Sequence, residues 1–442
     1  MTQTPGAAAS AVHPPTSQLR RVIGASLAGT TIEWYDFFVY ASAAGLVFGK
    51  QFFPGLDGTA ALLASFATIG VSFIARPIGG VVSGHLGDRF GRKPVLVGTL
   101  LLMGLATVGV GLLPSYASIG VAAPILLVVL RMLQGLSAGG EWGGAAMMSV
   151  EHAPPGRRGY YGAYPQIGVP IGLLLANLVF FAVSATTTPE QFQAWGWRIP
   201  FLLSIVLIVV GFWVRSRVAE SPVFEDLRER RERRSAPLAE VLRKDRRELL
   251  VAIGLFVANN MIGYILIAFI TSYGTRTLGL SSTTMLVVGM VGAVAWGVFT
   301  LMAGRWSDTW GRRRTYLIGI VALAAWCFPF FLLFDTRSIG LLIVAVVVLA
   351  FGLGLTYGQQ AATYAEMFPA PVRYSGVSFA YAFGAILGGG FAPLLATWLI
   401  AVTGTSLSAS AYMFAMCLVT LSAVLALREG TPAEREAFVT AS

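Results

Sequence analysis

Long apolar stretches alternate with short polar segments along almost the whole chain. Each stretch is long enough for an α-helix to cross a hydrocarbon core about 30 Å thick, at about 1.5 Å per residue. Lipid offers no hydrogen-bond partner to an open backbone, so helices are the expected form. The pattern predicts an all-α integral membrane protein with twelve transmembrane helices, near residues 22–48, 60–84, 94–113, 122–147, 159–184, 196–216, 248–275, 282–304, 315–334, 339–366, 374–402 and 408–427.

Composition agrees with this pattern. Only 12% of the 442 residues are charged and 56% are hydrophobic, whereas soluble globular domains carry about 25% charged residues. The first 18 residues lack the charged and apolar regions of a signal peptide, so we expect a disordered tail that is not cleaved. We therefore expect a multi-pass protein of a bacterial inner membrane.

The positive charges are distributed unevenly between alternate loops. With the N-terminus inside, 25 of the 31 Lys and Arg residues fall in cytoplasmic segments. This asymmetry follows the positive-inside rule and predicts that both termini are cytoplasmic. The net charge of +10 is thus explained by topology, and no nucleic-acid partner is expected.

A repeated motif divides the chain into two halves. Gly84-His-Leu-Gly-Asp-Arg-Phe-Gly-Arg-Lys93 recurs in part as Gly304-Arg-Trp-Ser-Asp-Thr-Trp-Gly-Arg-Arg313, 220 residues later. A second pair, Glu151 with Arg158, recurs as Glu366 with Arg373. Two pseudo-symmetric six-helix halves are expected, with substrate between them. The predicted parts are a tail at 1–18, an N-terminal half at 19–216, a cytoplasmic linker at 217–247, a C-terminal half at 248–428 and a tail at 429–442.

These motifs resemble those of the major facilitator superfamily. The Gly84–Lys93 segment looks like its signature loop, Arg131-x-x-Gln-Gly135 resembles its fourth-helix motif, and Glu220-Ser-Pro222 is similar to a motif of its sugar and metabolite porters. Further segments are similar to its metabolite:proton symporter family, and the run from Gln191 to Ile205 is closest to shikimate transporters. Those further segments are Glu33-Trp-Tyr-Asp-Phe37, Gly139-Gly-Glu-Trp-Gly-Gly144 and Arg373-Tyr-Ser-Gly376.

The resemblance implies the major facilitator fold and a function. Members of the family carry small organic acids or zwitterions together with protons, and their halves rock to expose the site alternately to each side. The leading hypothesis is proton-coupled import of a shikimate-like acid. Alternatives are another carboxylate such as 2-oxoglutarate or citrate, a zwitterion such as proline or betaine, proton-driven efflux and, from other classes, a channel or a membrane-embedded enzyme.

Five charged residues lie inside predicted spans, namely Glu33, Asp36, Arg76, Arg131 and Glu141. Each costs about 2.5–3.5 kcal/mol to insert on translocon scales, so each needs a function or a partner. Glu33, Asp36 and Arg131 lie at similar depth. A carboxylate paired with Arg131 would stay ionised until a substrate carboxylate drew the arginine away, and it would then take up a proton. A static ion pair that fixes helix packing is the alternative.

The other two charges have two interpretations each. Arg76 precedes Pro77, where a kink can open polar backbone to a cavity. Its guanidinium could hold a substrate carboxylate, or it could extend to the inner surface of the membrane. Glu141 is interpreted as a second protonation or gating site, or as a structural hydrogen-bonding group between helices.

Uncharged polar residues deep in the spans supply further candidates for substrate binding. They could bind hydroxyl and carboxylate groups, although polar residues also hold membrane helices together. The resemblance favours Gln166, Asn259, Gln359 and Gln360, because helices five, seven and ten face the cavity in this superfamily. The remaining candidates are Tyr35, Gln134, Tyr164, Asn177, Asn260, Tyr264 and Tyr357.

The repeated loops suggest a cytoplasmic latch. An aspartate there can face a helix N-terminus or an arginine of the opposite half, although a turn that only sets topology would have the same sequence. The gating candidates are Gly84, Asp88, Arg89, Gly91 and Arg92 in the first loop, and Asp308, Gly311 and Arg312 in the second.

Other chemistry is not indicated by the sequence. The histidines His13, His85 and His152 are scattered, so no metal site is predicted. Cys327 and Cys417 lie in apolar spans and are interpreted as packing residues. A phosphate-binding Walker loop is missing from the sequence, which argues against ATP as the energy source. We predict a monomer without cofactors, driven by an ion gradient.

Overall fold

The computed structural model describes residues 16–90, 92–139, 141–154, 156–216 and 242–429, with some helical side chains left out. In these residues every regular element is helical. Each of the twelve predicted spans contains a helix, and several helices run beyond the predicted ends. The segment between the second and third spans, expected to be a loop, is mostly a continuation of the second helix, which ends at Phe90.

The first six spans form the N-terminal half. The first span contains a π-helical segment, and the fourth comprises α6 and α7, on either side of residue 140, which is outside the described residues. Its elements are α1 (Thr16–Ala43), η1 (Ala44–Phe48), α2 (Gly49–Phe52), α3 (Gly58–Phe90), α4 (Arg92–Leu112), α5 (Tyr116–Ile119), α6 (Ala122–Ala138), α7 (Glu141–Glu151), α8 (Arg158–Thr186), α9 (Pro189–Ala194), η2 (Gly196–Arg198), α10 (Ile199–Leu202) and α11 (Ser204–Ser216).

The last six spans form the C-terminal half. The seventh and eleventh spans contain π-helical segments, as the first does. The elements are α14 (Arg246–Tyr264), η3 (Ile265–Phe269), α15 (Ile270–Ser272), η4 (Tyr273–Thr277), α16 (Ser282–Trp310), α17 (Arg312–Phe334), α18 (Ile339–Tyr357), α19 (Gln360–Met367), α20 (Ala370–Ala385), η5 (Ile386–Gly390), α21 (Ala392–Thr403) and α22 (Leu407–Ala426).

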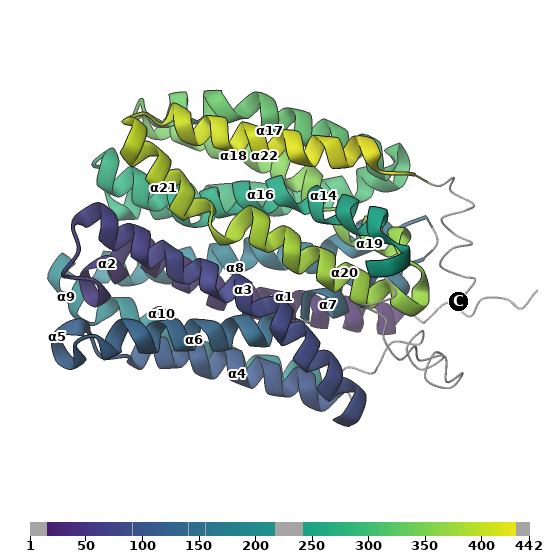
Figure 1. Cartoon of the computed structure of the whole chain (residues 1–442), viewed down its shortest axis with the longest axis horizontal. Coiled ribbons are helices and arrows are strands. Elements are labelled where there is room, and N and C mark those ends of the chain that lie inside the picture. Colours follow the sequence, from purple (N-terminus) through teal and green to yellow (C-terminus); the bar gives the residue numbers. More distant parts are fainter. Residues whose placement is uncertain (1–15, 91, 140, 155, 217–241, 430–442) are drawn as a thin grey trace, which may run out of the picture.

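The two halves lie side by side, one below the other in Figure 1, and the C-terminal end lies at the right of the bundle. The long helices α8 and α16 pack against each other across the interface, and α3 packs against α20, η5 and α21. Within each half, neighbouring helices pack as α1 on α8, α3 on α6, α16 on α18 and α17 on α22. The space between the halves is therefore bounded by α1, α3 and α8 from one side and α14, α16 and α20 from the other.

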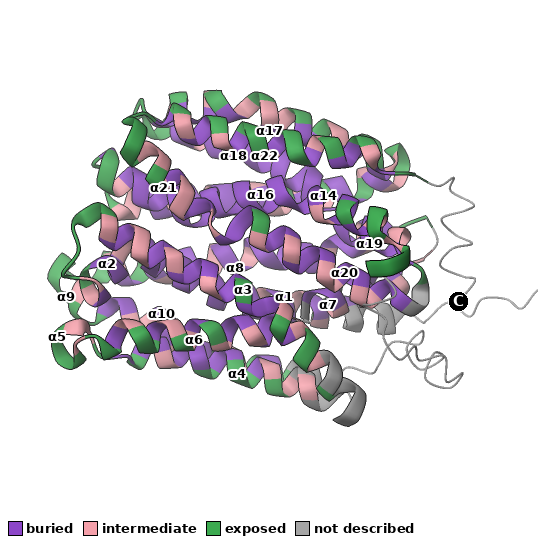
Figure 2. Ribbon diagram, in the orientation of Figure 1, coloured by how far each residue is buried: buried purple, intermediate pink, exposed green. Residues whose placement is uncertain are grey.

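The outer faces of the helices are apolar and exposed. Figure 2 shows exposed residues along the outside of the bundle and buried ones along its middle. Leu105, Val209, Leu250 and Leu332 are among the large exposed apolar residues. Ten helices in the described part of the chain are long and apolar enough to span a membrane, and α1 and α4 occupy the two other predicted spans. A surface of this kind fits lipid rather than water.

The π-helical segments reflect the internal repeat. Segment η1 begins at Ala44 and η3 begins at Ile265, 221 residues further along, which matches the offset of the repeated loop motif. The two segments contact each other across the interface. Equivalent helices in the two halves thus carry the same irregularity at the same place.

Candidate functional site

Four of the five charges predicted inside spans are buried together in the N-terminal half. Asp36, Glu33, Arg76 and Arg131 are each at most 3% exposed. They come from α1, α3 and α6; α1 and α3 contact the C-terminal half, and α6 packs against α3. The side chain of Glu141 lies outside what the structure describes.

Arg76 lies among aromatic rings. Its guanidinium carbon is 4.3 Å from the ring centroid of Phe37 and 4.4 Å from that of Phe73. Helices α3 and α6 approach each other closely here. A Cβ atom added to Gly139 would lie only 2.0 Å from the carbonyl oxygen of Arg76. Two guanidinium nitrogens, Nε and Nη2, find no hydrogen-bond partner among the described atoms. Arg76 is thus held inside the bundle and does not extend to the membrane surface.

Arg131 is fully buried beside the rings of Tyr40 and Phe37, at 4.0 and 4.8 Å from their centroids. Its Nη1 donates a 2.9 Å hydrogen bond to Gln134 Oε1. Within the described residues, its Nε and Nη2 are without a hydrogen-bond acceptor. An unsatisfied buried donor costs about 1–3 kcal/mol, so both arginines present unused binding capacity.

Asp36 is held by a hydroxyl group. Ser204 Oγ of α11 donates a 2.6 Å hydrogen bond to Asp36 Oδ1. The direct ion pair between Asp36 and Arg131, considered from the sequence, is not among the ion pairs of the described residues. Arg131 Nη1 is bonded instead to Gln134, whose Nε2 donates to Thr107 Oγ1 at 2.7 Å.

A small cavity lies next to these charges, between the two halves. Its volume is about 10 Å³, about enough for one water molecule. The electrostatic influence of Arg76 reaches the Tyr264, Tyr357 and Tyr381 hydroxyls, and that of Arg131 reaches Tyr264. The lining residues are Trp34, Val169, Phe256, Asn259, Asn260, Gly263, Tyr264, Ile267, Trp296, Tyr357 and Tyr381.

Several polar atoms of the cavity wall have no partner within the described structure. They are Trp34 Nε1, Asn260 Oδ1, Tyr264 OH, Trp296 Nε1, Tyr357 OH and Tyr381 OH. Buried polar groups in native proteins nearly always find a hydrogen-bond partner, so an unpaired cluster indicates a place for a ligand or water. Together with the two arginines, most of these atoms are donors, which favours a ligand rich in acceptors.

Aromatic side chains close one end of the cavity. Trp142 of α7 stacks on Tyr381 of α20 with ring centroids 3.8 Å apart, and Tyr381 stacks in turn on Phe256 at 4.3 Å. Gln166 accepts a 2.9 Å hydrogen bond from Trp142 Nε1 and donates to the Tyr357 carbonyl at 3.2 Å. These contacts join the two halves directly.

The predicted polar candidates fall into two groups. Asn259, Asn260 and Tyr264 line the cavity, as does Tyr357, and Gln166 lies at its aromatic end. Others bond to neighbouring groups outside the cavity lining. They are Tyr35, which donates to the Pro200 carbonyl; Gln134, which joins Arg131 to Thr107; Tyr164, which bonds to Tyr160; Gln359, which donates to the Leu355 carbonyl; Gln360, which donates to Tyr364; and Asn177, which lies against Gly289.

Aromatic residues were the main omission from the sequence-based candidates. The candidates were chosen for charge or polarity, so they did not include four aromatic residues that line the cavity. These four are Trp34, Phe256, Trp296 and Tyr381. Trp34 lies next to the motif residues Glu33 and Asp36, which was a usable signal. The hydroxyls of Thr107 and Ser204 were also missed, because a single hydroxyl in an apolar helix is common and carries little information.

Asp308 also connects the halves, at the start of α8. It accepts hydrogen bonds from the backbone N–H groups of Gly159 and Tyr160, at 2.7 and 2.8 Å, in the first turn of α8. A carboxylate at a helix N-terminus is favoured by the unpaired N–H groups and the helix dipole. Arg312 donates to Asp308 at 2.8 Å and to Glu366 at 3.0 Å, which holds the carboxylate in place.

A second ion pair crosses the interface nearby, from Arg373 to Glu151 at 3.7 Å. Gly311 has a φ of 93° and begins α17, and the backbone N–H of Arg312 donates to Glu429. In the equivalent first loop, Gly84, Asp88, Arg89 and Arg92 belong to α3 and α4, but their side chains lie outside the described structure. Gly91 is itself outside the described residues.

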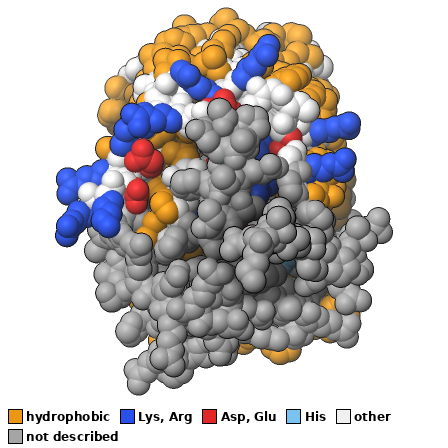
Figure 3. Space-filling view, turned by 90° about the vertical axis from the view of Figure 1, so that its right-hand side faces the viewer, with side chains coloured by type: hydrophobic (Ala, Val, Ile, Leu, Met, Phe, Trp, Pro, Cys, Tyr) orange, Lys and Arg blue, Asp and Glu red, His pale blue; other side chains and the backbone are white. Residues whose placement is uncertain are grey.

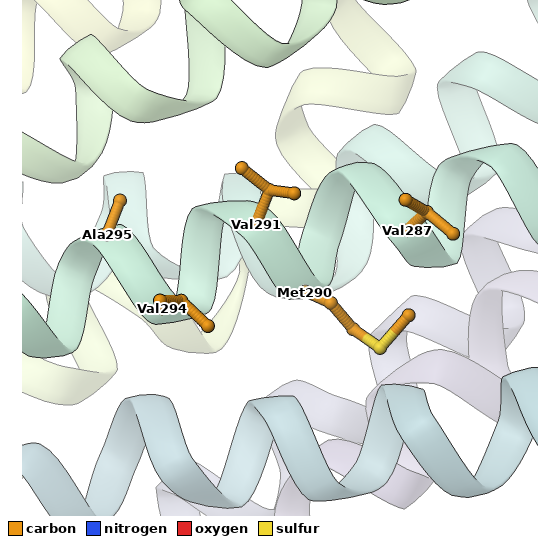
Figure 4. Close-up of a pocket in the computed structure, with 5 residues that line it drawn as sticks. All are labelled: Val287, Met290, Val291, Val294 and Ala295. Carbon is orange, nitrogen blue, oxygen red and sulfur yellow. The ribbon is translucent and has the colours of Figure 1, made fainter.

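Two other places on the molecule have different chemistry. A groove of about 450 Å³ on α16 is lined only by Val287, Met290, Val291, Val294 and Ala295 (Figure 4), so it offers nothing to a charged ligand. The end of the bundle that carries the latch residues bears basic side chains (Figure 3). They include Arg243, Lys244, Arg246, Arg247, Arg305, Arg313 and Arg314, all exposed.

The chain is similar to characterised families along its whole length. The model of the Major Facilitator Superfamily matches residues 26–386 and 297–441. The inner membrane metabolite transport protein YhjE of Escherichia coli is 42% identical over 94% of this chain and 96% of its own length. The Escherichia coli shikimate transporter is 40% identical over 93% and 95% of the two chains.

Other relatives carry different substrates. The proline/betaine transporter of Salmonella typhimurium is 34% identical over 93% of this chain and 84% of its own. Among solved structures, that of the proton:xylose symporter XylE bound to 6-bromo-6-deoxy-D-glucose superposes with a TM-score of 0.75, at 19% identity, over 96% of this chain and 99% of the other. This likeness confirms the predicted twelve-helix fold class.

Proposed function

Because the chain belongs to the major facilitator superfamily, and within it to the metabolite:proton symporter family, we propose that it imports a small organic acid together with protons. The proposed substrate resembles shikimate, a compact carboxylic acid with hydroxyl groups. Transport proceeds by alternating access across a bacterial inner membrane, with both chain termini in the cytoplasm and the monomer as the working unit.

One observation carries this proposal, the unused donors beside the cavity. Arg76 and Arg131 each keep two guanidinium nitrogens without a partner among the described residues, and Trp34, Tyr264 and Trp296 add further unpaired polar atoms. A carboxylate accepts from such donors with charge-assisted hydrogen bonds. Hydroxyl groups on the same molecule fit Asn259, Asn260 and Tyr264 of the wall.

The buried acids supply the proton site. Asp36 and Glu33 lie three residues apart on α1, and Arg131 acts electrostatically on Asp36. When Arg131 turns toward a substrate carboxylate, Asp36 loses part of its stabilisation as an anion and takes up a proton. Substrate and proton then enter together, and each proton that crosses 100 mV supplies about 2.3 kcal/mol.

The closed state fits an intermediate of the cycle. The cavity has room for only about one water molecule, Trp142 of one half stacks on Tyr381 of the other, and Asp308 and Arg373 each bond across the interface. We propose that the Asp308 latch and the equivalent residues of the first loop, Gly84 to Arg92, hold the cytoplasmic side shut. Opening toward the cytoplasm would require the latch contacts to separate. Opening toward the outside would require the contacts of η1 with η3 to separate.

A zwitterion such as betaine is the second candidate. Six aromatic residues line the cavity, namely Trp34, Phe256, Tyr264, Trp296, Tyr357 and Tyr381. Faces of aromatic rings bind quaternary ammonium groups, while the arginines would take the carboxylate of the same molecule. The positive charges of the two arginines repel a quaternary ammonium group, but they do not repel a neutral ring. The organic acid is therefore the preferred candidate.

Uptake into proteoliposomes tests both candidates. Labelled shikimate, 2-oxoglutarate, citrate, proline and betaine would each be offered with an imposed inward proton gradient, with and without an ionophore that collapses it. We expect accumulation of one hydroxylated or simple carboxylate, and its loss with the ionophore. Accumulation of betaine alone would favour the second candidate, and flux that neither saturates nor responds to the gradient would contradict both.

A further inference from the structure

Three aromatic side chains form a ladder along α1. Trp34, Phe37 and Tyr40 lie three residues apart, so they follow one another along one side of the helix with a rise of about 4.5 Å between them. All three are at most 2% exposed. The ring centroids of Trp34 and Phe37 are 5.8 Å apart. We call these three residues the α1 ladder.

Two arginines lie against successive steps of the α1 ladder. The guanidinium carbon of Arg76, from α3, is 5.4 Å from the ring centroid of Trp34 and 4.3 Å from that of Phe37. The guanidinium carbon of Arg131, from α6, is 4.8 Å from the centroid of Phe37 and 4.0 Å from that of Tyr40. Phe37 is thus shared by both arginines. Their guanidinium carbons are at most about 9 Å apart, the sum of their two distances to Phe37.

The shared ring compensates for the closeness of two positive charges. Like charges at this distance repel each other more strongly in a buried site than in water. The face of an aromatic ring carries partial negative charge and attracts a cation. Because both guanidinium groups lie over the ring of Phe37, this one side chain attracts both of them.

Contact with a ring leaves the hydrogen-bond donors of an arginine available. A planar guanidinium group can rest against a ring while its N–H groups point outward in the guanidinium plane. A carboxylate in place of the ring would accept hydrogen bonds from those same N–H groups. In keeping with this, Nε and Nη2 of both Arg76 and Arg131 have no hydrogen-bond partner among the described atoms.

We propose that Phe37 is a positioning residue, which holds the guanidinium groups of Arg76 and Arg131 ready for a substrate carboxylate by attracting both cations to one ring. Phe37 is not part of the described cavity wall, so it acts on the substrate only through the arginines. The purpose of this positioning rests on the proposed function. The attraction between the ring and the two cations is a separate claim, and it can be tested without a substrate.

Fluorinated phenylalanines at position 37 test this attraction. Fluorine withdraws electrons from the ring face and changes the size of the ring only slightly, so it weakens the hold on a cation and largely preserves packing. The melting temperature of the purified full-length protein would be measured with mono-, di- and trifluorophenylalanine. The same series at Phe38 is the matched control, because Phe38 is fully buried on the same helix and has no cation over its ring among the described contacts. We expect a stepwise fall at position 37 relative to position 38.

Arg76→Met and Arg131→Met identify the cations that are responsible. Each substitution should reduce the fall at position 37 by about half, and the double variant should abolish it. A fall of equal size in the parent and in the double variant would overturn the proposal, because simple packing of the ring does not need the arginines. The two single variants give independent cycles, so the result does not depend on one variant folding.

Uptake of labelled shikimate into proteoliposomes tests the positioning itself. Trifluorophenylalanine at position 37 should raise the apparent KM at least threefold and leave the maximal rate unchanged, whereas the same residue at position 38 should change neither. An unchanged KM at position 37 would overturn the positioning role. Failure of the parent protein to accumulate any acid would contradict the proposed function instead, and the melting temperatures would still decide whether Phe37 holds the two arginines.

Discussion

Trp142 stacks face to face on Tyr381, with ring centroids 3.8 Å apart and ring planes inclined by 10°. The two rings belong to α7 and α20, on opposite sides of the interface between the halves. Their contact closes the cavity at the end nearer to Glu151 and Arg373. A substrate leaving on that side has to separate them.

Removing the stack should open this end of the cavity. An aromatic pair contributes about 0.5–1.5 kcal/mol, so Trp142→Ala should raise the population open on this side about two- to tenfold. The measurement is the labelling rate of Asn260→Cys by an impermeant maleimide, in a background with Cys327→Ala and Cys417→Ala. Trp142→Phe keeps a ring and should label at close to the parent rate. Equal labelling in the Ala and Phe variants would show that the stack is not a gate.

Asp36→Asn should separate transport from its driving force. The amide keeps the hydrogen bond from Ser204 but cannot carry a proton through the cycle. We expect exchange of labelled substrate at equal concentrations to continue, and accumulation under a proton gradient to fall at least tenfold. Ser204→Ala is the comparison, since it keeps the carboxylate. Gradient-driven accumulation at the parent level in Asp36→Asn would assign the proton to another residue.

Arg131→Lys should be nearly as damaging as Arg131→Ala. An ammonium cannot hold Gln134 and a substrate carboxylate at once with the planar geometry of the guanidinium. Uptake should fall at least tenfold in both variants, with the apparent KM raised in the Lys variant. Parent-like uptake by Arg131→Lys would show that a point charge is enough at this position.

Asp308→Ala should weaken the closure of the latch. The lost cap of α8 contributes about 0.5–2 kcal/mol, which corresponds to an increase of about two- to thirtyfold in the open population. Spin labels at the exposed positions Arg157 and Arg313 would report the distance between the halves by pulsed electron resonance. Thr309→Ala is the matched control, because Thr309 is exposed and bonds only within its own helix. An unchanged distance distribution in Asp308→Ala would argue for a role in topology alone.

The helices could be predicted from sequence because twenty or more apolar residues in a row leave the backbone little choice in lipid. Because each span is a regular helix with a fixed rise per residue, the sequence positions of the buried charges also predicted that they lie at similar depth. What the sequence did not provide was side-chain direction. Tyr35, for example, lies one position from Asp36, yet it donates to Pro200 on α10 and not to the cavity.

The partner of Arg131 shows the same limit. Helical depth brought Asp36 and Arg131 to one level of the membrane, and an ion pair was the simplest inference. The structure instead bonds Arg131 to Gln134 of its own helix, and Asp36 to Ser204 of α11. Such an arrangement depends on the rotation of three helices about their axes, and a hydrophobic pattern that is nearly uniform around each helix does not encode that rotation.

The paired π-helical segments η1 and η3 bear on how the outer parts of the bundle move. A π turn holds one residue more than an α turn, and it is often found where a helix changes shape in function. Passing that extra residue along the helix turns the residues that it passes by about 100° and shifts them by about 1.5 Å. Both segments lie in equivalent helices and contact each other. The residues at this contact can therefore turn against each other while the first and seventh spans remain helical, and no flexible loop is needed.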